Sequence, residues 1–97
     1  MSNSESIAGR IGKIEKALKD ALKPKFLDVA DESHLHVGHA GARAGLGHFH
    51  VTVVADQFAG LGMVKRHRLV YAAVGDLMVT DIHALGIEAR APDEPAS

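Results

Sequence analysis

Apolar residues recur at intervals of three and four positions near the start of the chain, which is the spacing of one face of an α-helix. The stripe consists of Ile7, Ile11, Ile14, Leu18 and Leu22. Charged residues occupy the opposite side, where Glu15 and Lys19 are four positions apart and can form an ion pair. Because a proline disfavours the helical conformation in the residue before it, Pro24 predicts that this helix ends near Leu22.

Three further segments alternate between apolar and polar residues, as β-strands do when one face is buried. The first covers residues 26–30, where Asp28 interrupts the apolar positions. The second covers residues 47–55, where phenylalanine and valine alternate with histidine and threonine. The last covers residues 82–90, with its odd-numbered side chains from 83 to 89 on one side, and Pro92 ends it.

Between the last two strands, a broad apolar arc predicts a second helix that begins near Met63. Its members are Met63, Val64, His67, Val70, Tyr71, Val74, Leu77 and Met78. Gly75 predicts a break in this helix, followed by a short third helix over residues 76–80. Because His67 lies in the middle of the apolar arc, we expect it to be largely buried and not to bind a ligand.

The predicted order of elements is helix, strand, strand, helix, helix, strand. The first two strands should pair antiparallel, and the helical crossover favours a right-handed parallel pairing of the second and third. The expected fold is therefore an α/β (α+β) domain, with a three-stranded mixed sheet and helices packed on one face. A chain of 97 residues has room for one core, so we expect a single domain over residues 1–97, with its core at about 7–92 and polar tails.

Composition excludes several classes of function. A formal net charge of −1 provides no overall positive field that would attract nucleic acid or a membrane. No apolar run approaches the length of a membrane span and no secretory signal is visible, so we expect a cytoplasmic location. The chain has no cysteine, which excludes disulfides, thiol catalysis and a metal site built from its own thiolates. No nucleophile–base pair or cofactor loop indicates an enzyme.

Histidine and glycine are concentrated in one segment, from His34 to His50, which holds five of the seven histidines and four glycines. Imidazole is the commonest protein metal ligand, and glycine permits backbone conformations that other residues resist. Such a loop can close on a metal or a partner, or it can be a solvated hairpin loop, and composition leaves both open. Any metal site must use His, Asp or Glu of this chain or thiolates of a partner.

Several short motifs, in their order and spacing, resemble those of the BolA family. They are Phe58-x-Gly60, Val64-x-Arg66-His67-Arg68-x-Val70-Tyr71 and Ile82-His83-Ala84-Leu85, preceded by Asp31-Glu32-Ser33, His39 and His48-Phe49. The resemblance extends from about residue 7 to residue 92, nearly the entire chain. It implies a class II KH-like fold, in agreement with the predicted order of elements, and it implies no enzymatic activity.

The resemblance also implies a partner and a cofactor. Family members bind a monothiol glutaredoxin and share a bridging 2Fe–2S cluster with it, in iron–sulfur trafficking or iron sensing. One ligand would be His83, and the second would come from the loop between the first two strands, where His39 is the best positional match. His34 and His36 lie nearby, and His48 is a further choice. Two histidines can replace two cysteines on one iron, so the partner would supply two thiolates, and the chain alone would hold no cluster. The resemblance implies that these thiolates are a glutaredoxin cysteine and glutathione.

A run of basic residues leaves a second function open. Lys65, Arg66 and Arg68 lie on the predicted second helix, and two helices joined at a glycine match a helix-turn-helix in outline. Some bacterial members of the family are DNA-binding transcriptional regulators linked to cell shape and stress. With one tyrosine, three phenylalanines and no tryptophan, recognition of single strands by stacking is disfavoured, whereas contact with double-stranded DNA stays open. The alternative is a solvated basic face.

Overall fold

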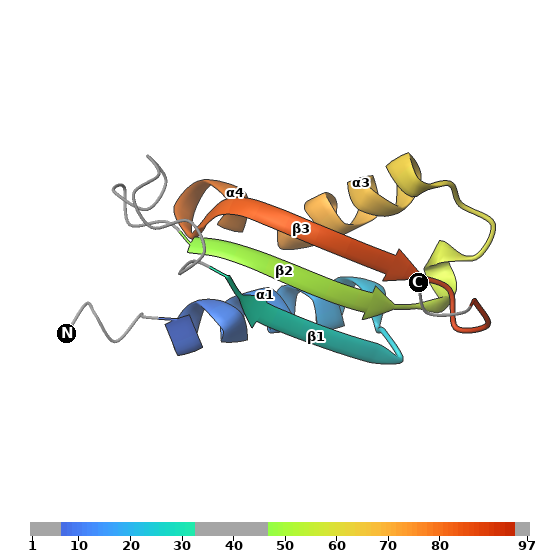
Figure 1. The fold of residues 1–97 in the computed structure, drawn as a ribbon, viewed down its shortest axis with the longest axis horizontal. Coiled ribbons are helices and arrows are strands. Elements are labelled where there is room, and N and C mark those ends of the chain that lie inside the picture. The colour runs from blue at the N-terminus through green and yellow to red at the C-terminus, as the bar shows by residue number, and fades with distance from the viewer. Residues whose placement is uncertain (1–6, 33–46, 95–97) are drawn as a thin grey trace.

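The computed structural model describes residues 7–32 and 47–94, and Figure 1 shows how their elements are arranged. In chain order these are α1 (Ile7–Leu22), β1 (Phe26–Asp31), β2 (Gly47–Val54), the 3-10 helix η3 (Asp56–Phe58), α3 (Met63–Val74), α4 (Leu77–Thr80) and β3 (Ile82–Arg90). This order confirms the predicted α-β-β-α-α-β arrangement. The addition is η3, a single turn in the segment that leads to α3.

α1 and α3 end where the sequence predicted, next to Pro24 and Gly75. After α1, Lys23 adopts a positive φ of 47°, and its amide still donates to the carbonyl of Lys19 at 3.0 Å before Pro24 stops the helix. After α3, Gly75 adopts a φ of 55°, a conformation that side chains with a Cβ resist, and its amide donates to Tyr71 at 2.9 Å. Gly75 therefore separates α3 from α4 as predicted.

The sheet is mixed, with β2 in the centre. β1 pairs antiparallel with β2 so that Val29 lies opposite Val51, and β3 pairs parallel with β2 so that Ile87 lies on the other side of Val51. The parallel register has one irregularity: Gly47 pairs with Ile82, but His48 pairs with Ala84. His83 is therefore an extra residue in β3, which is the arrangement of a β-bulge.

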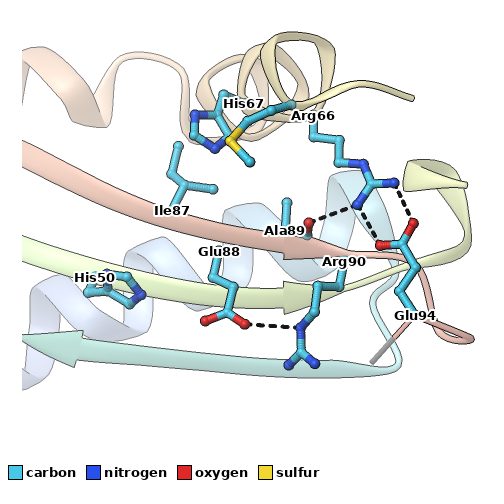
Figure 2. A pocket seen from close by; sticks show the side chains of 9 residues that line it. His50, Arg66, His67, Ile87, Glu88, Ala89, Arg90 and Glu94 are labelled. Carbon is cyan, nitrogen blue, oxygen red and sulfur yellow. Dashed lines mark hydrogen bonds and ion pairs between the residues drawn. The ribbon is translucent and has the colours of Figure 1, made fainter. Parts of the chain in front are cut away.

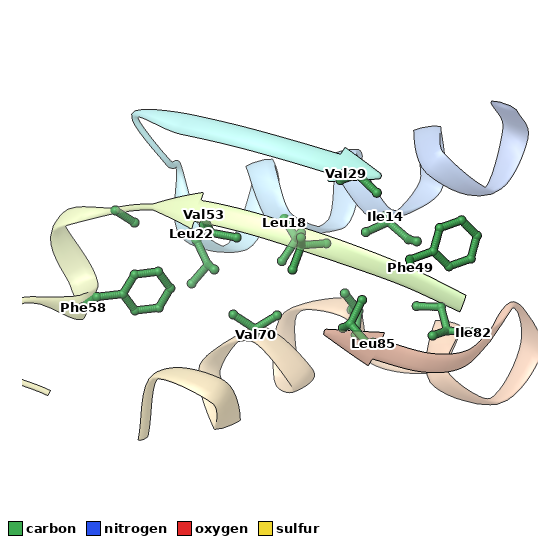
Figure 3. Packing of buried hydrophobic residues seen from close by; sticks show 13 residues of the cluster. Ile14, Leu18, Leu22, Val29, Phe49, Val53, Phe58, Val70, Ile82 and Leu85 are labelled. Carbon is green, nitrogen blue, oxygen red and sulfur yellow. The ribbon is translucent and has the colours of Figure 1, made fainter. Parts of the chain in front are cut away.

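The core lies between one face of the sheet and the helices α1 and α3, as Figure 3 shows. The face toward the helices is formed chiefly by Phe49, Val51, Val53 and Leu85. The helices contribute Ile14, Leu18 and Leu22 from α1 and Val70 and Val74 from α3. Burial of each such side chain contributes roughly 1.5–3 kcal/mol to folding, so the stripe on α1 and the alternation in β2 fix the fold, as predicted.

The apolar arc predicted for the second helix was too broad. Only its stripe through Val70 and Val74 is buried, whereas Met63 is 70% exposed and Val64 is 64% exposed. His67, which we expected to be largely buried, is half-buried and lies outside the core cluster. The physical reason is that α3 meets the sheet along one narrow stripe, which leaves its flanks open to solvent.

The last strand departs from the predicted alternation at its start. His83 was expected on the same side as Leu85, yet Ile82 and Leu85 are buried and His83 is exposed. The bulge causes this, because one extra residue shifts the alternation between the two buried positions. In the part of the chain that the structure describes, no helix is both long enough and apolar enough to cross a membrane.

Candidate functional site

Three strand ends meet at one end of the sheet, which we call the mouth: the end of β1, the start of β2 and the start of β3. Two main-chain hydrogen bonds close it. The amide of Glu32 donates to the carbonyl of His48 at 2.7 Å, and the amide of Gly47 donates to the carbonyl of Asp81 at 3.0 Å. The histidine-rich segment joins β1 and β2 at this end, so the fold brings its anchoring points next to His83.

His83 is exposed, whereas nearby residues of β3 are held in the core. Its neighbour Ile82 is 1% exposed, Leu85 is also buried, and both belong to the core. The bulge places His83 beside the step from Gly47 to His48 in β2. The main chain at His83 is thus held by core packing while its imidazole is open to solvent, which suits a ligand for a metal that a partner presents.

The other predicted ligands fall into two groups. His48 lies on β2, on the face away from α1 and α3, and is half-buried. His34, His36 and His39 lie outside the described residues, and their role stays a prediction. Within residues 7–32 and 47–94, no group of three His, Asp or Glu side chains is placed to bind a metal ion.

A buried carboxylate holds the main chain just before the bulge. Asp81 is 6% exposed and accepts hydrogen bonds from the Thr80 hydroxyl and from Lys13 Nζ at 3.3 Å, with Arg10 Nε at 3.6 Å. Burial alone would raise the pKa of Asp81, but the bonds from Thr80 and Lys13 outweigh it and hold the pKa below its usual value. Asp81 is therefore ionised at neutral pH and ties α1 to the start of β3.

A groove of about 620 Å³ lies at the other end of the molecule, between α3 and β3. Figure 2 shows that the side chains lining it come from both sides of β3. It is lined by Met63, Arg66 and His67 of α3, by Ile87, Glu88, Ala89 and Arg90 of β3, and by His50 and Glu94. The volume is in the range of ligand sites, and the lining mixes apolar and charged groups.

Arg66, predicted to contact nucleic acid, is already engaged within the chain. Its two terminal nitrogens bind the two oxygens of Glu94 at 2.7 Å each, and Nη1 also donates to the carbonyl of Ala89 at 3.0 Å (Figure 2). Nε donates to the carbonyl of Leu61 at 2.8 Å. The side chain is 13% exposed. We therefore correct the predicted interface: Arg66 holds the chain after β3 against α3, because four of its five N–H donors have partners.

The partner of Arg66 is strongly acidic. The hydrogen bond from Arg66, together with one from the amide of Ala91, lowers the pKa of Glu94 to about 2. Glu94 lies in the segment after Pro92 that the sequence predicted to be a polar tail. The sequence did hold one indication of this pair. Arg66 stands next to the apolar arc, so its charged side chain required a partner if it packed against the apolar face.

Lys65 and Arg68 differ from Arg66. Both are exposed, and neither forms an ion pair with another residue of the described ranges. Val64 and Tyr71 are exposed on the same helix, one turn before Arg68 and one turn after it. The outer face of α3 is therefore basic and partly apolar, and of the three predicted nucleic-acid contacts it retains two.

Comparison with known proteins places these features in a family. The family model described as "BolA: BolA-like protein" matches residues 18–94. The chain is 39% identical over 98 residues to SufE-like protein 1, chloroplastic/mitochondrial, of Arabidopsis thaliana, which covers 96% of this chain and only 26% of that protein. It is 44% identical over 81 residues to the DNA-binding transcriptional regulator BolA of Vibrio cholerae, covering 84% of this chain and 74% of that protein.

A solved structure agrees with the sequence comparison. The BolA domain of SufE1 from Arabidopsis thaliana superposes with a TM-score of 0.80 at 37% identity, covering 93% of this chain and all of that domain. The elements described above therefore occur in the same arrangement in a protein that shares more than a third of its residues with this chain. Fold and family agree with each other.

Proposed function

Because the chain belongs to the BolA-like protein family, we propose that it is an adaptor, not an enzyme, that binds a monothiol glutaredoxin and co-ligates a 2Fe–2S cluster with it. The observation that carries the proposal is His83, an exposed imidazole on a bulge whose flanking residues are buried. We place this activity in cytoplasmic iron–sulfur trafficking or iron sensing.

The donor atoms of the chain support a shared site. When bound, the cluster would accept an electron or be transferred to another protein. It would need four ligands, and this chain has imidazoles but no thiolate. His83 would supply one ligand and a histidine of the β1–β2 segment the second, in the order of preference His39, His48, then His34 and His36. The glutaredoxin cysteine and glutathione would supply the remaining two.

The mouth favours a fixed ligand at His83. Asp81 and Ile82 anchor the chain before it, and Leu85 anchors it afterwards. A partner that binds there meets an imidazole whose main chain does not have to reorganise, and a preorganised ligand loses less entropy on binding. His83 would thus orient one iron, while the histidine from the adjoining segment completes the pair.

The outer face of α3 supports a protein partner and keeps DNA as the second candidate. Val64 and Tyr71 are large exposed apolar residues, which are typical of protein interfaces. Lys65 and Arg68 are exposed cations without intramolecular partners in the described ranges. Because a relative is a DNA-binding transcriptional regulator, we propose double-stranded DNA as the alternative ligand of these two residues.

Reconstitution tests the proposed function. The purified chain alone should be colourless, because it has no thiolate. With iron, sulfide, glutathione and a monothiol glutaredoxin, it should form a coloured one-to-one heterodimer with the absorbance of a 2Fe–2S cluster. A stable cluster on this chain without the partner would contradict the ligand count, and absence of any complex would contradict the choice of partner.

A further inference from the structure

The charged side chains that line the groove between α3 and β3 are paired with one another. Arg66 binds Glu94 at 2.7 Å, and their formal charges cancel. Arg90 Nε lies 3.1 Å from a carboxylate oxygen of Glu88, which forms a second neutral pair. The other lining side chains that can bind a ligand are two imidazoles and one thioether, so the binding chemistry of the groove depends on these three.

The thioether and one of the imidazoles lie on the same side of α3. Met63 and His67 are four positions apart, which on a helix places their Cβ atoms roughly 5–6 Å apart, and both line the groove. Helical side chains lean toward the N-terminal turn, so the imidazole of His67 leans toward Met63. Met63 is the first residue of α3 and is 70% exposed, and its unbranched side chain adapts its shape readily. Its sulfur can therefore reach the same ligand as a ring nitrogen of His67.

The imidazole of His67 is available for such a ligand. Among the described residues it has no hydrogen-bond partner, yet neither of its nitrogens is buried. The other imidazole, that of His50, lies on the opposite side of β3 (Figure 2). It rests so close to the main chain of β3 that a Cβ at Gly86 would lie 2.7 Å from its Nδ1. The pair is therefore Met63 and His67, without His50.

We propose that Met63 and His67 bind one soft monovalent cation, Cu(I) or its stable analogue Ag(I). A thioether is a soft ligand that selects Cu(I), and imidazole also suits copper. Both ions accept a linear pair of ligands, so the site does not require a group of three His, Asp or Glu side chains, which the described residues lack. The site contains no residue of the mouth, so it is independent of the proposed function.

The electrostatics of the groove favour a single positive charge over a double one. Met63 stands at the N-terminus of α3, which is the positive end of the helix dipole and opposes a cation. The nearby carboxylate of Glu94 is already neutralised by Arg66, so it offers little compensation. Hard divalent cations prefer oxygen ligands, and the two carboxylates of the groove are bound to arginines. A monovalent ion with soft ligands meets neither obstacle in full.

Nuclear magnetic resonance of the full chain with isotope-labelled methionine methyl groups tests the site. Total uptake of silver does not identify it, because five of the seven histidines lie between His34 and His50. The methyl resonance of Met63 reports locally and should shift on addition of silver nitrate in a chloride-free buffer. Zn²⁺, which prefers four ligands, should leave it in place at the same concentration. A resonance that ignores Ag(I), or that shifts equally with Zn²⁺, would overturn the proposal.

Two variants test the pair from its two sides. In His67→Ala, the silver concentration that half-saturates the Met63 shift should rise at least about tenfold, since loss of even an outer-shell partner weakens metal binding by about 10–100-fold. Met63→Leu keeps the volume of the side chain and removes the sulfur. It should raise by a similar factor the silver concentration at which the ring resonances of His67 respond. Met78→Leu, a matched control on α4, should change neither response.

The outcomes decide between a paired site and isolated ligands. An unchanged half-saturation in His67→Ala would show that Met63 binds silver alone, which refutes the pair. Equal weakening by Met78→Leu would refute it as well, because that variant removes a thioether outside the groove. If His67→Ala fails to fold, Met63→Leu decides, since Met63 is largely exposed and its replacement leaves the core intact. Weakening by both site variants, with no change in the control, supports the proposal.

Discussion

An ion pair with a helix holds each end of β3, but the two ends differ in whether a residue predicted to bind a ligand remains exposed. At its start, the buried carboxylate of Asp81 is bound by Lys13 of α1. At its end, the guanidinium of Arg66 in α3 is bound by Glu94. Each network joins a helix to the end of the strand. The first leaves His83 exposed beside it, whereas in the second Arg66, which the sequence predicted to contact nucleic acid, is bound to Glu94.

This difference shows that a position in a basic sequence motif is not sufficient evidence that a residue binds a ligand. Arg66, His67 and Arg68 are adjacent, yet Arg66 is bound within the chain, His67 lines the groove and Arg68 is exposed. What separates them is the side of α3 on which each lies. We therefore propose ligand binding for the exposed groups that have no partner among the described residues, and we assign a stabilising role to the buried pairs.

The largest loss of stability is expected at the start of β3. Asp81→Ala should lower the free energy of unfolding by about 2–3 kcal/mol, because it leaves Lys13 and Arg10 without their buried partner. Asp76→Ala, an exposed position in the preceding turn, is the control and should change it by less than about 0.5 kcal/mol. Urea unfolding of both variants measures this. Equal stabilities would show that the Asp81 network does not hold the strand.

A second comparison separates Arg66 from Arg68. Arg66→Ala should lower the melting temperature, because it leaves Glu94 and the carbonyls of Leu61 and Ala89 without their donor. Arg68→Ala should leave the melting temperature nearly unchanged, since an exposed residue without a partner among the described residues contributes little. Thermal unfolding of the two variants checks this. A lower melting temperature for Arg68→Ala than for Arg66→Ala would reverse the assignment.

Acid should weaken the end of β3 through Glu94. Its pKa is lowered in the folded chain from 4.5 to about 2, so its contribution to stability is complete above the unfolded value and is lost as the pH falls through 4.5 toward 2. Glu94→Gln should therefore be less stable than the unmodified chain at pH 6, and the gap should narrow at pH 3. Urea unfolding at both pH values measures the gap, and a gap that widens at pH 3 would contradict the assignment.

If α3 also binds duplex DNA, Lys65 and Arg68 should carry the contact. Removing both should flatten the dependence of log affinity on log salt concentration by about two units, since each lost phosphate contact reduces the slope by about one. Arg66→Ala, measured on folded protein, should leave the slope unchanged because its guanidinium is bound to Glu94. An unchanged slope in the double variant would move the DNA site elsewhere.

The replacement of His67 is expected to have a smaller effect on stability than its place in the apolar arc suggested. Burial in the arc predicted a loss of about 2–4 kcal/mol for His67→Ala. Because His67 lines the groove and is only half-buried, we now expect about 1 kcal/mol. Urea unfolding distinguishes the two values, and a loss near 4 kcal/mol would mean that His67 packs as a core residue.

Local patterns were sufficient to predict most of the fold. The stripe on α1, the alternation in β2 and the glycine after α3 each depend on neighbours within a few positions, and the pairing of the strands follows from their order. The exposure of His83 as a possible ligand agreed with its place at the start of a strand, although the bulge that produces this exposure was not foreseen.

The remaining features depend on contacts between distant residues. Asp81 and Lys13 are 68 positions apart, and Arg66 and Glu94 are 28 apart, so neither pair leaves a periodic signal. The bulge at His83 inserts one extra residue into β3, next to the hydrogen bond between Gly47 and Asp81. Simple alternation therefore predicted the wrong side of the strand for His83. Ion pairs and bulges at the ends of strands therefore required the three-dimensional structure.

The most direct test of the central claim is the visible absorbance of the reconstituted glutaredoxin heterodimer carrying His83→Ala. The variant should keep the melting temperature of the unmodified chain, because His83 is exposed, and should lose the cluster absorbance or release the cluster much faster. His39→Ala should weaken the cluster less, since His34, His36 or His48 can substitute, and His50→Ala is the control for loss of an imidazole. A His83→Ala heterodimer with normal cluster spectra and lability would contradict the metal-binding account and favour DNA as the ligand.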